Sequence, residues 1–151
     1  MTHRIDYTKA SPEGYKAFGS VYLTLLKGEL PKELIDLVYL RVSQINGCAF
    51  CIDMHSRDLL KSGLPVDKLV LVQVWGDAGN VFNARERAAL AWAETVTHVS
   101  ETGVPDSDYV AAAAEFKDKE LTELTYAIGL MNAFNRFGIS FRTTPAAAAK
   151  A

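Results

Sequence analysis

Cysteine is scarce in this chain of 151 residues, which contains two cysteines and three histidines. Two cysteines cannot form the dense disulfide framework of small secreted domains, and a chain of this length buries enough surface to fold without one. Apolar runs such as LVLV at 69–72 are far shorter than the roughly 20 residues of a membrane-spanning helix. The N-terminal sequence MTHRIDYTKASPEGYK lacks an apolar signal-peptide core. We therefore expect a soluble cytoplasmic protein.

The chain also lacks a large excess of charge of either sign. Its formal net charge is -2, and charged residues make up 23% of it. This balance gives no reason to expect nucleic acid or an anionic membrane as a partner. Neither an internal repeat nor a linker divides the sequence, so we expect one domain over 1–142, followed by a disordered Ala-rich tail, TTPAAAAKA, over 143–151.

Alternating strand patterns are missing, whereas helical signals recur along the chain. Three kinds of signal mark the helix boundaries. They are Pro residues at the start of apolar-periodic segments, endings with Asn-Gly or with Gly followed by Pro, and one capping sequence, NARE at 83–86. These signals predict an all-α fold of about six to seven helices. The expected helices cover approximately 12–27, 31–45, 48–61, 66–75, 84–97, 105–116 and 118–139.

The segment INGCAFCIDMHSRDLL, residues 45–60, contains both cysteines and one histidine. On a helix that turns about 100° per residue, Cys51 lies about 60° from Cys48 around the axis, and His55 about 20° from Cys48. The three side chains therefore share one face. A helix N-terminus favours the thiolate form of a cysteine, and an imidazole one turn later can act as base or proton carrier. This pattern predicts a redox dithiol assisted by a histidine, without a cofactor.

A metal site and a pair of core thiols are the competing interpretations. Cys48, Cys51 and His55 supply three possible zinc ligands, but a closed structural site usually has four. His98 is the distant histidine available as a fourth ligand, since His3 lies in a terminal segment that we expect to fray. A thioredoxin-like site would set the CxxC motif among strands, which this sequence does not predict. We therefore favour the redox dithiol on a helical scaffold.

Two acidic residues on the preceding helix are candidates for a group that orients the histidine. Glu33 and Asp36 are three residues apart and share a face of that helix. If the Asn46-Gly47 turn folds the helix back along the cysteine helix, one carboxylate can complete a chain of nucleophile, base and orienting group. The simpler interpretation is a solvated helix face, and for Glu33 it is stabilisation of the helix N-terminus.

The segment LIDLVYLRVSQINGCAFCIDMHSRDLLKSG, residues 34–63, resembles the core of alkyl hydroperoxidase AhpD-like proteins in the carboxymuconolactone decarboxylase superfamily. The resemblance continues through RERAALAWAETVT and LMNAFNRFGISFR, at 85–97 and 130–142. It implies an all-helical fold, assembly into homotrimers or homohexamers, and a dithiol peroxidase that reduces hydroperoxides. It also implies an external dithiol reductant that restores the oxidised CxxC pair.

The same resemblance assigns roles to four residues. Cys51 corresponds to the cysteine that attacks the peroxide, Cys48 to its resolving partner, His55 to the relay histidine and Asp36 to the relay acid. Helix-end electrostatics alone would instead activate the more N-terminal Cys48. We follow the resemblance, because Cys51 and His55 are four residues apart, the spacing that brings two helical side chains into contact.

Two positions depart from the AhpD pattern. Phe50 stands where those enzymes have a histidine before the second cysteine, and Asp36 stands where they usually have glutamate. Decarboxylases of the superfamily lack the CxxC pair, so the dithiol argues against decarboxylation. An isomerase- or decarboxylase-like pocket lined by Trp75, Trp92 and Phe50 is the remaining alternative. The apolar helix at 118–139 exceeds the needs of one small core, which indicates a homo-oligomer.

Overall fold

A computed structural model describes residues 3–150, without the side chains of 149 and 150. All regular structure in this range is helical, which confirms the all-α prediction. The helices are α1 (Tyr7–Ala10), α2 (Pro12–Leu25), α3 (Lys32–Asn46), α4 (Ala49–Lys61), α5 (Val66–Leu71), α6 (Ala84–Thr97), α7 (Val99–Thr102), α8 (Asp106–Ala113) and α9 (Asp118–Ser140), with 3-10 helices η1 (Val72–Asp77) and η2 (Ala146–Lys150). Among these described helices, none combines the length and apolar character needed to cross a bilayer.

Two short helices, α1 and α7, have four residues each and were not expected from the sequence. Such short segments carry too few residues for an apolar period to be recognised. The sequence predicts a disordered tail from residue 143, whereas the structure places η2 within it, and the Ala147 N–H donates to Asp53 Oδ2 at 3.2 Å. Ala151, the last residue of that predicted tail, lies outside the described residues.

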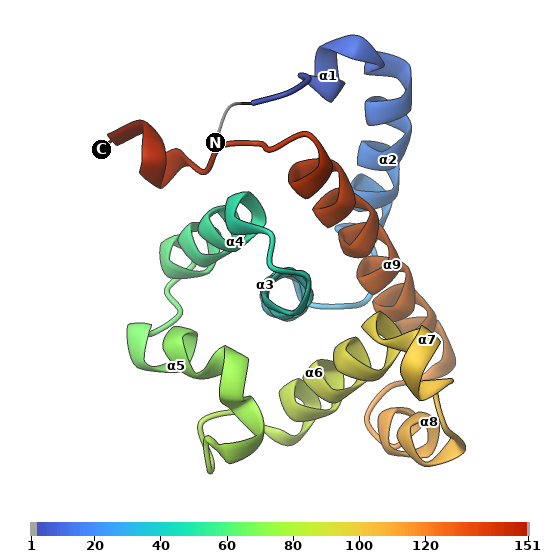
Figure 1. The fold of residues 1–151 in the computed structure, drawn as a ribbon. Helices are drawn as coiled ribbons and strands as arrows, with labels where there is room; N and C mark the ends of the chain where they lie inside the picture. Colours follow the sequence, from blue (N-terminus) through green and yellow to red (C-terminus); the bar gives the residue numbers. More distant parts are fainter. Residues whose placement is uncertain (1–2, 151) are drawn as a thin grey trace.

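Helix α3 occupies the centre of the fold. It is seen end-on in Figure 1, with α4, α6 and α9 around it, and it contacts all three. Every residue from Leu34 to Leu40 is buried. A helix that is buried on all sides is expected to be apolar all round, so its one acidic residue within this stretch, Asp36, is conspicuous.

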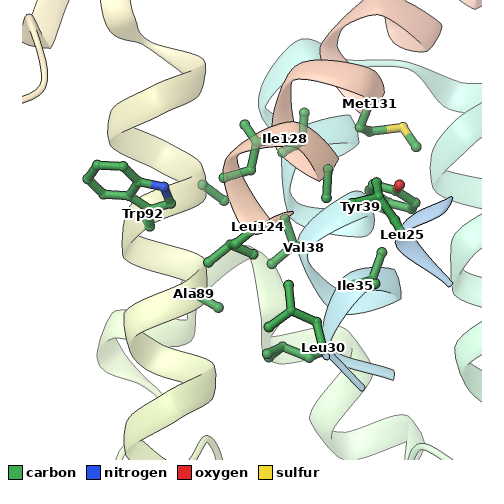
Figure 2. Packing of buried hydrophobic residues seen from close by; sticks show 14 of the residues in the cluster. Leu25, Leu30, Ile35, Val38, Tyr39, Ala89, Trp92, Leu124, Ile128 and Met131 are labelled. Carbon is green, nitrogen blue, oxygen red and sulfur yellow. The ribbon is translucent and has the colours of Figure 1, made fainter. Parts of the chain in front are cut away.

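Two apolar clusters flank α3. The larger joins it to α2, α6, α8 and α9, and Figure 2 shows Val38 of α3 close to Leu124 of α9. The smaller lies between α3, α4, η1 and α6, and its buried members are Leu37, Leu40, Leu59, Leu64, Val72, Phe82 and Leu90. Because α3 and α9 belong to a continuous core, the side chains they hold near α4 have fixed positions.

The turn between α3 and α4 depends on a glycine. Gly47 has φ 69°, in the left-handed region that glycine adopts without steric cost, and it ends α3. The Cys48 N–H then donates to the Ser43 carbonyl at 3.0 Å, and α4 begins at the next residue. The sequence prediction that Asn46-Gly47 folds the two helices together is supported by the contact between α3 and α4.

The start of α6 shows why Glu86 is a structural residue. The Glu86 N–H donates to Asn83 Oδ1 at 2.9 Å, and the Asn83 N–H donates to Glu86 Oε2 at 2.9 Å. This reciprocal pair is the capping box expected from NARE, and it satisfies amides that the helix itself leaves free. Lys68 Nζ also pairs with Glu86 Oε1 at 2.6 Å, so both carboxylate oxygens are engaged.

The segment before α1 and the segment after α9 run side by side (Figure 1). The Arg4 N–H donates to the Phe141 carbonyl at 3.0 Å, and Arg4 Nη1 donates to the Ser140 carbonyl at 3.1 Å. The Tyr7 ring lies 5.6 Å from the Phe137 ring and 5.7 Å from the Phe141 ring, measured between centroids. Hydrogen bonds and aromatic contacts therefore hold the N-terminal segment against the end of α9.

Candidate active site

Cys48 and Cys51 form a disulfide at the start of α4. Their Cα atoms are 5.3 Å apart, and their exposed fractions are 1% and 2%. Cys48 is the N-cap residue, and its Sγ accepts a hydrogen bond from the Cys51 N–H at 3.4 Å. The expected pairing of the two sulfurs at a helix N-terminus is thus present, in a position where the helix dipole stabilises a thiolate after reduction.

Helix α9 packs closely against the two sulfurs at Gly138. A Cβ atom at this position would lie 3.0 Å from Cys48 Sγ and 3.6 Å from Cys51 Sγ. The first of these distances is shorter than an ordinary van der Waals contact, so the absence of a side chain lets α9 approach the disulfide. Sequence reasoning missed Gly138, because nothing local distinguishes it from Gly129 on the same helix.

Gly138→Val is expected to lower the free energy of unfolding of the oxidised protein by about 2–3 kcal/mol, because added methyl groups must displace the sulfurs or α9. Gly129→Val is the matched control, since Gly129 is exposed on α9 and has open space around its Cβ position. That control should change stability by only a few tenths of a kcal/mol. Urea unfolding measures both variants, and equal effects would show that the approach of α9 to the sulfurs is unimportant.

A buried polar network fixes the end of α3 against α9 beside the cysteines. Asn135 is fully buried; its Nδ2 donates to Ser43 Oγ at 3.0 Å, and its Oδ1 accepts from Asn46 Nδ2 at 2.9 Å. Asn46 Nδ2 also reaches Asn132 Oδ1 at 3.0 Å. Because buried polar groups are costly to leave unpaired, this network fixes the register of α9 relative to the α3–α4 turn.

His55 lies one helical turn after Cys51 and has an exposed fraction of only 5%. Neither ring nitrogen has a hydrogen-bond partner among residues 3–150. Burial lowers the pKa of His55 to about 4, an effect that nearby Asp58 opposes and nearby Lys32 reinforces. In the disulfide form the imidazole is therefore neutral at physiological pH, with both nitrogens free to exchange protons with a reacting group.

Asp36 lines the same cavity as Cys51 and His55, but it is paired with another residue. Its exposed fraction is 2%, and its carboxylate accepts a hydrogen bond from Lys32 Nζ, one turn earlier in α3. Burial raises the pKa of Asp36, while Lys32 opposes the rise. No hydrogen bond between Asp36 and His55 is present, so the two residues share the site without direct contact of their polar atoms. Glu33 is exposed in the first turn of α3.

Tyr39 is a site residue that sequence reasoning missed. Its ring lies 5.2 Å from the His55 ring, and its buried hydroxyl has no hydrogen-bond partner among the described residues. Burial raises the pKa of Tyr39, so the hydroxyl remains protonated and can donate a hydrogen bond. Its position three residues after Asp36, on the same face of α3, is the signal that could have identified it.

A cavity of about 350 Å³ connects these groups. Cys51, His55, Asp36 and Tyr39 line it, and so does Phe50, which stands at the position of the AhpD histidine. Cys48 is not among the lining residues. The sequence expectation that His3 belongs to a frayed terminus differs from the structure, in which His3 also lines this cavity. A cavity of this size is suited to a small organic molecule.

Trp75, Trp92 and His98 line a different cavity, of about 540 Å³, which includes neither cysteine. Trp75 Nε1 donates to Glu94 Oε1 at 2.7 Å, and Trp92 Nε1 donates to Thr125 Oγ1 at 2.9 Å. The alternative pocket lined jointly by Trp75, Trp92 and Phe50 is therefore wrong, because Phe50 faces the cavity at Cys51 instead. Within residues 3–150, no group of three or more His, Cys, Asp or Glu side chains is arranged to hold a metal ion.

The family of the chain follows from its sequence. Residues 12–95 match the model of the carboxymuconolactone decarboxylase family, which corresponds to most of the helical core from α2 through α6. The chain belongs to this family, and its resemblance to AhpD-like proteins is confirmed.

Two relatives match nearly the whole chain. An uncharacterised protein of Bacillus subtilis, YdfG, is 30% identical over 140 residues, which span 93% of this chain and 95% of that protein. A crystal structure from Agrobacterium tumefaciens is 40% identical with a TM-score of 0.92, covering 95% of this chain and 98% of that one. It is of a protein of unknown function for which a role as the antioxidant defence protein AhpD has been suggested.

A second solved structure is similar to this chain in its fold only. An uncharacterised peroxidase-related protein from Ralstonia eutropha, described as an alkylhydroperoxidase AhpD core, is 22% identical with a TM-score of 0.80. The similarity covers 91% of this chain and 73% of that one. At this identity the similarity concerns the helical architecture.

Proposed function

We propose that this protein is a dithiol hydroperoxide reductase in which Cys51 attacks the substrate. The observation that carries the proposal is the placement of Cys51 in a cavity beside neutral His55, with Cys48 bonded to it from outside the cavity wall. Reduction of the disulfide would leave a Cys51 thiol in the cavity that His55 also lines. The family membership and the suggested antioxidant role of the A. tumefaciens relative support the same chemistry.

The cycle begins with reduced Cys48 and Cys51. His55 accepts the Cys51 proton, and the thiolate sulfur attacks the terminal oxygen of the hydroperoxide, breaking the O–O bond. The sulfur becomes a sulfenic acid, and the departing alkoxide takes a proton from His55 to leave as an alcohol. The Cys48 sulfur then attacks Cys51 Sγ, which forms the disulfide and releases water. An external dithiol reduces the disulfide by thiol–disulfide exchange and is itself oxidised.

The structure supports the order in which the two cysteines act. Cys51 is in the cavity, whereas Cys48 faces Gly138 of α9 and caps α4. A substrate that enters the cavity meets Cys51 first. His55 serves as proton acceptor and donor in this proposal. Asp58 and Lys32 are the charged groups that act on the imidazole, and Asp36 is paired with Lys32 without binding His55.

A reducing compartment such as the cytoplasm suits this cycle, because the resting pair must be reduced before each turnover. Assembly into a homotrimer or homohexamer is also part of the proposal. Several large apolar side chains are exposed on the single chain, and such surfaces commonly pack against a second copy. The exposed residues with this character include Phe18, Leu23, Val99, Val110 and Tyr126.

A single-turnover experiment tests the proposed function. Reduced protein is mixed with an equal amount of cumene hydroperoxide, without reductant. We expect formation of one equivalent of alcohol and loss of two hydrogens from the peptide that contains Cys48 and Cys51, measured by mass spectrometry before and after reduction. Prior alkylation of the reduced protein is the control and should block both changes. Unchanged protein mass with intact peroxide would overturn the proposal.

A further inference from the structure

We infer that the cavity at Cys51 selects neutral molecules and rejects those that carry a carboxylate, so that among organic hydroperoxides the uncharged ones are the substrates. The identity of the oxidant rests on the proposed function. The charge selection itself concerns any molecule that must reach the Cys51 sulfur, and it can be tested without peroxide. The inference follows from the size of the cavity, its apolar wall and the signs of the charges along it.

The size and the wall favour an organic substrate over hydrogen peroxide. The cavity is about 350 Å³, and a water molecule occupies about 30 Å³ in the liquid, so a hydrogen peroxide molecule would leave most of it unused. Aromatic side chains from five helices form much of the wall, namely Tyr7, Tyr15, Tyr22, Tyr39, Phe50 and Phe134. Such a lining stabilises an apolar group through burial and aromatic contacts.

The charged groups on the lining all have one sign. Asp6, Asp36 and Asp58 line the cavity, and no lysine or arginine is among its described lining residues. Two of these carboxylates have cationic partners: Lys32 pairs with Asp36, and Lys9 lies 3.3 Å from Asp6. Asp58 has no ion-pair partner in the part of the chain that the structure describes.

An anionic substrate therefore faces two separate penalties. Its carboxylate would leave water for a largely apolar cavity whose described lining includes no lysine or arginine, which costs free energy. It would also approach the exposed carboxylate of Asp58 on α4, one turn beyond His55. A neutral molecule of the same shape meets neither penalty, so the cavity discriminates by charge as well as by size.

Alkylation of the reduced protein tests the charge selection directly. Iodoacetamide and iodoacetate both alkylate a thiolate, and they differ by an amide against a carboxylate. We expect the iodoacetamide-to-iodoacetate rate ratio at Cys51 to be at least about tenfold larger in the folded protein than in the urea-unfolded protein. Peptide mass spectrometry separates Cys51 from Cys48. Equal ratios in the folded and unfolded protein would overturn the inference.

A charge reversal at an exposed lining residue sharpens this test. Asp58→Lys is expected to lower the folded-protein ratio about threefold to tenfold by removing a repulsion and adding an attraction. Asp67→Lys is the matched control: it makes the same charge change at an exposed residue of α5 that does not line the cavity, and it should leave the ratio unchanged. If both variants change the ratio equally, net charge rather than the cavity is responsible, and the inference is wrong.

Turnover of cumene hydroperoxide and its para-carboxylate extends the test to the proposed reaction, with dithiothreitol as the neutral reductant. We expect kcat/KM at least about tenfold higher for the uncharged member. Failure of both peroxides to react would contradict the proposed function but leave the alkylation result as evidence on charge selection. Equal turnover of both would contradict the charge selection while supporting the peroxidase.

Discussion

Cys51→Ser is expected to lower the rate of hydroperoxide reduction by about 10³-fold or more, because a serine hydroxyl cannot replace the thiolate as nucleophile. Cys51 is the only one of the two cysteines that lines the cavity, so no neighbouring thiol can take its place there. Stopped-flow measurement of cumene hydroperoxide loss, with reduced protein in excess, gives the rate of this first step. A variant that retains the wild-type rate would show that Cys51 is not the attacking residue.

Cys48→Ser is the matched control, and it is expected to retain the first step of the reaction and to lose the second. Serine is a favourable N-cap residue, so the substitution preserves the start of α4 that Cys48 now caps. The variant should consume one equivalent of peroxide at close to the wild-type rate and then stop with a sulfenic acid on Cys51, which dimedone labelling detects. If Cys48→Ser loses the first step and Cys51→Ser keeps it, the assignment of the two cysteines is reversed.

His55→Gln is expected to lower the rate of the same first step by about 10²-fold, the usual minimum contribution of a general base. Glutamine keeps a polar side chain of similar length, but it cannot accept the Cys51 proton. The pH at which thiolate absorbance near 240 nm appears should therefore rise in the variant, because the thiolate loses a group that can become its counter-charge. These two readouts together separate loss of a base from general loss of structure.

Two further variants serve as controls for His55. His98→Gln changes a histidine that lines the other cavity, so neither readout should move. Tyr39→Phe retains the ring 5.2 Å from the His55 ring and removes only the hydroxyl, which distinguishes ring packing from hydrogen bonding. If His55→Gln leaves the rate and the thiolate titration unchanged, the proton must leave Cys51 by another route, and the proposed role of His55 is wrong.

The sequence predicted the parts of the site that depend on local structure. The turn at Gly47, the shared face of Cys51 and His55, and the capping box at Asn83 all follow from spacing or from the preferences of one residue. Each involves residues within about one helical turn of each other. For such features the helix repeat alone determines which side chains meet.

Contacts between distant segments could not be predicted in the same way. Gly138 meets Cys48 because α9 packs against the start of α4, and Asn135 meets Ser43 because α9 also packs against α3. The orienting contact from Asp36 to His55 that we considered is not formed, because Lys32 lies one turn from Asp36 and pairs with it locally. A helical period shows which face is apolar, but not which residue of another helix it will touch.

The outer wall of the cavity is distinct from the elements that hold the sulfurs. Helices α3, α4 and α9 surround the disulfide, while α1 and α2 contribute Tyr7 and Tyr15 to the cavity wall. Substitutions in α1 or α2 therefore change what enters without disturbing the turn at Gly47. Selection can adapt such a protein to new substrates by changing this part of the wall, while the reactive pair and the chemistry it performs are inherited unchanged.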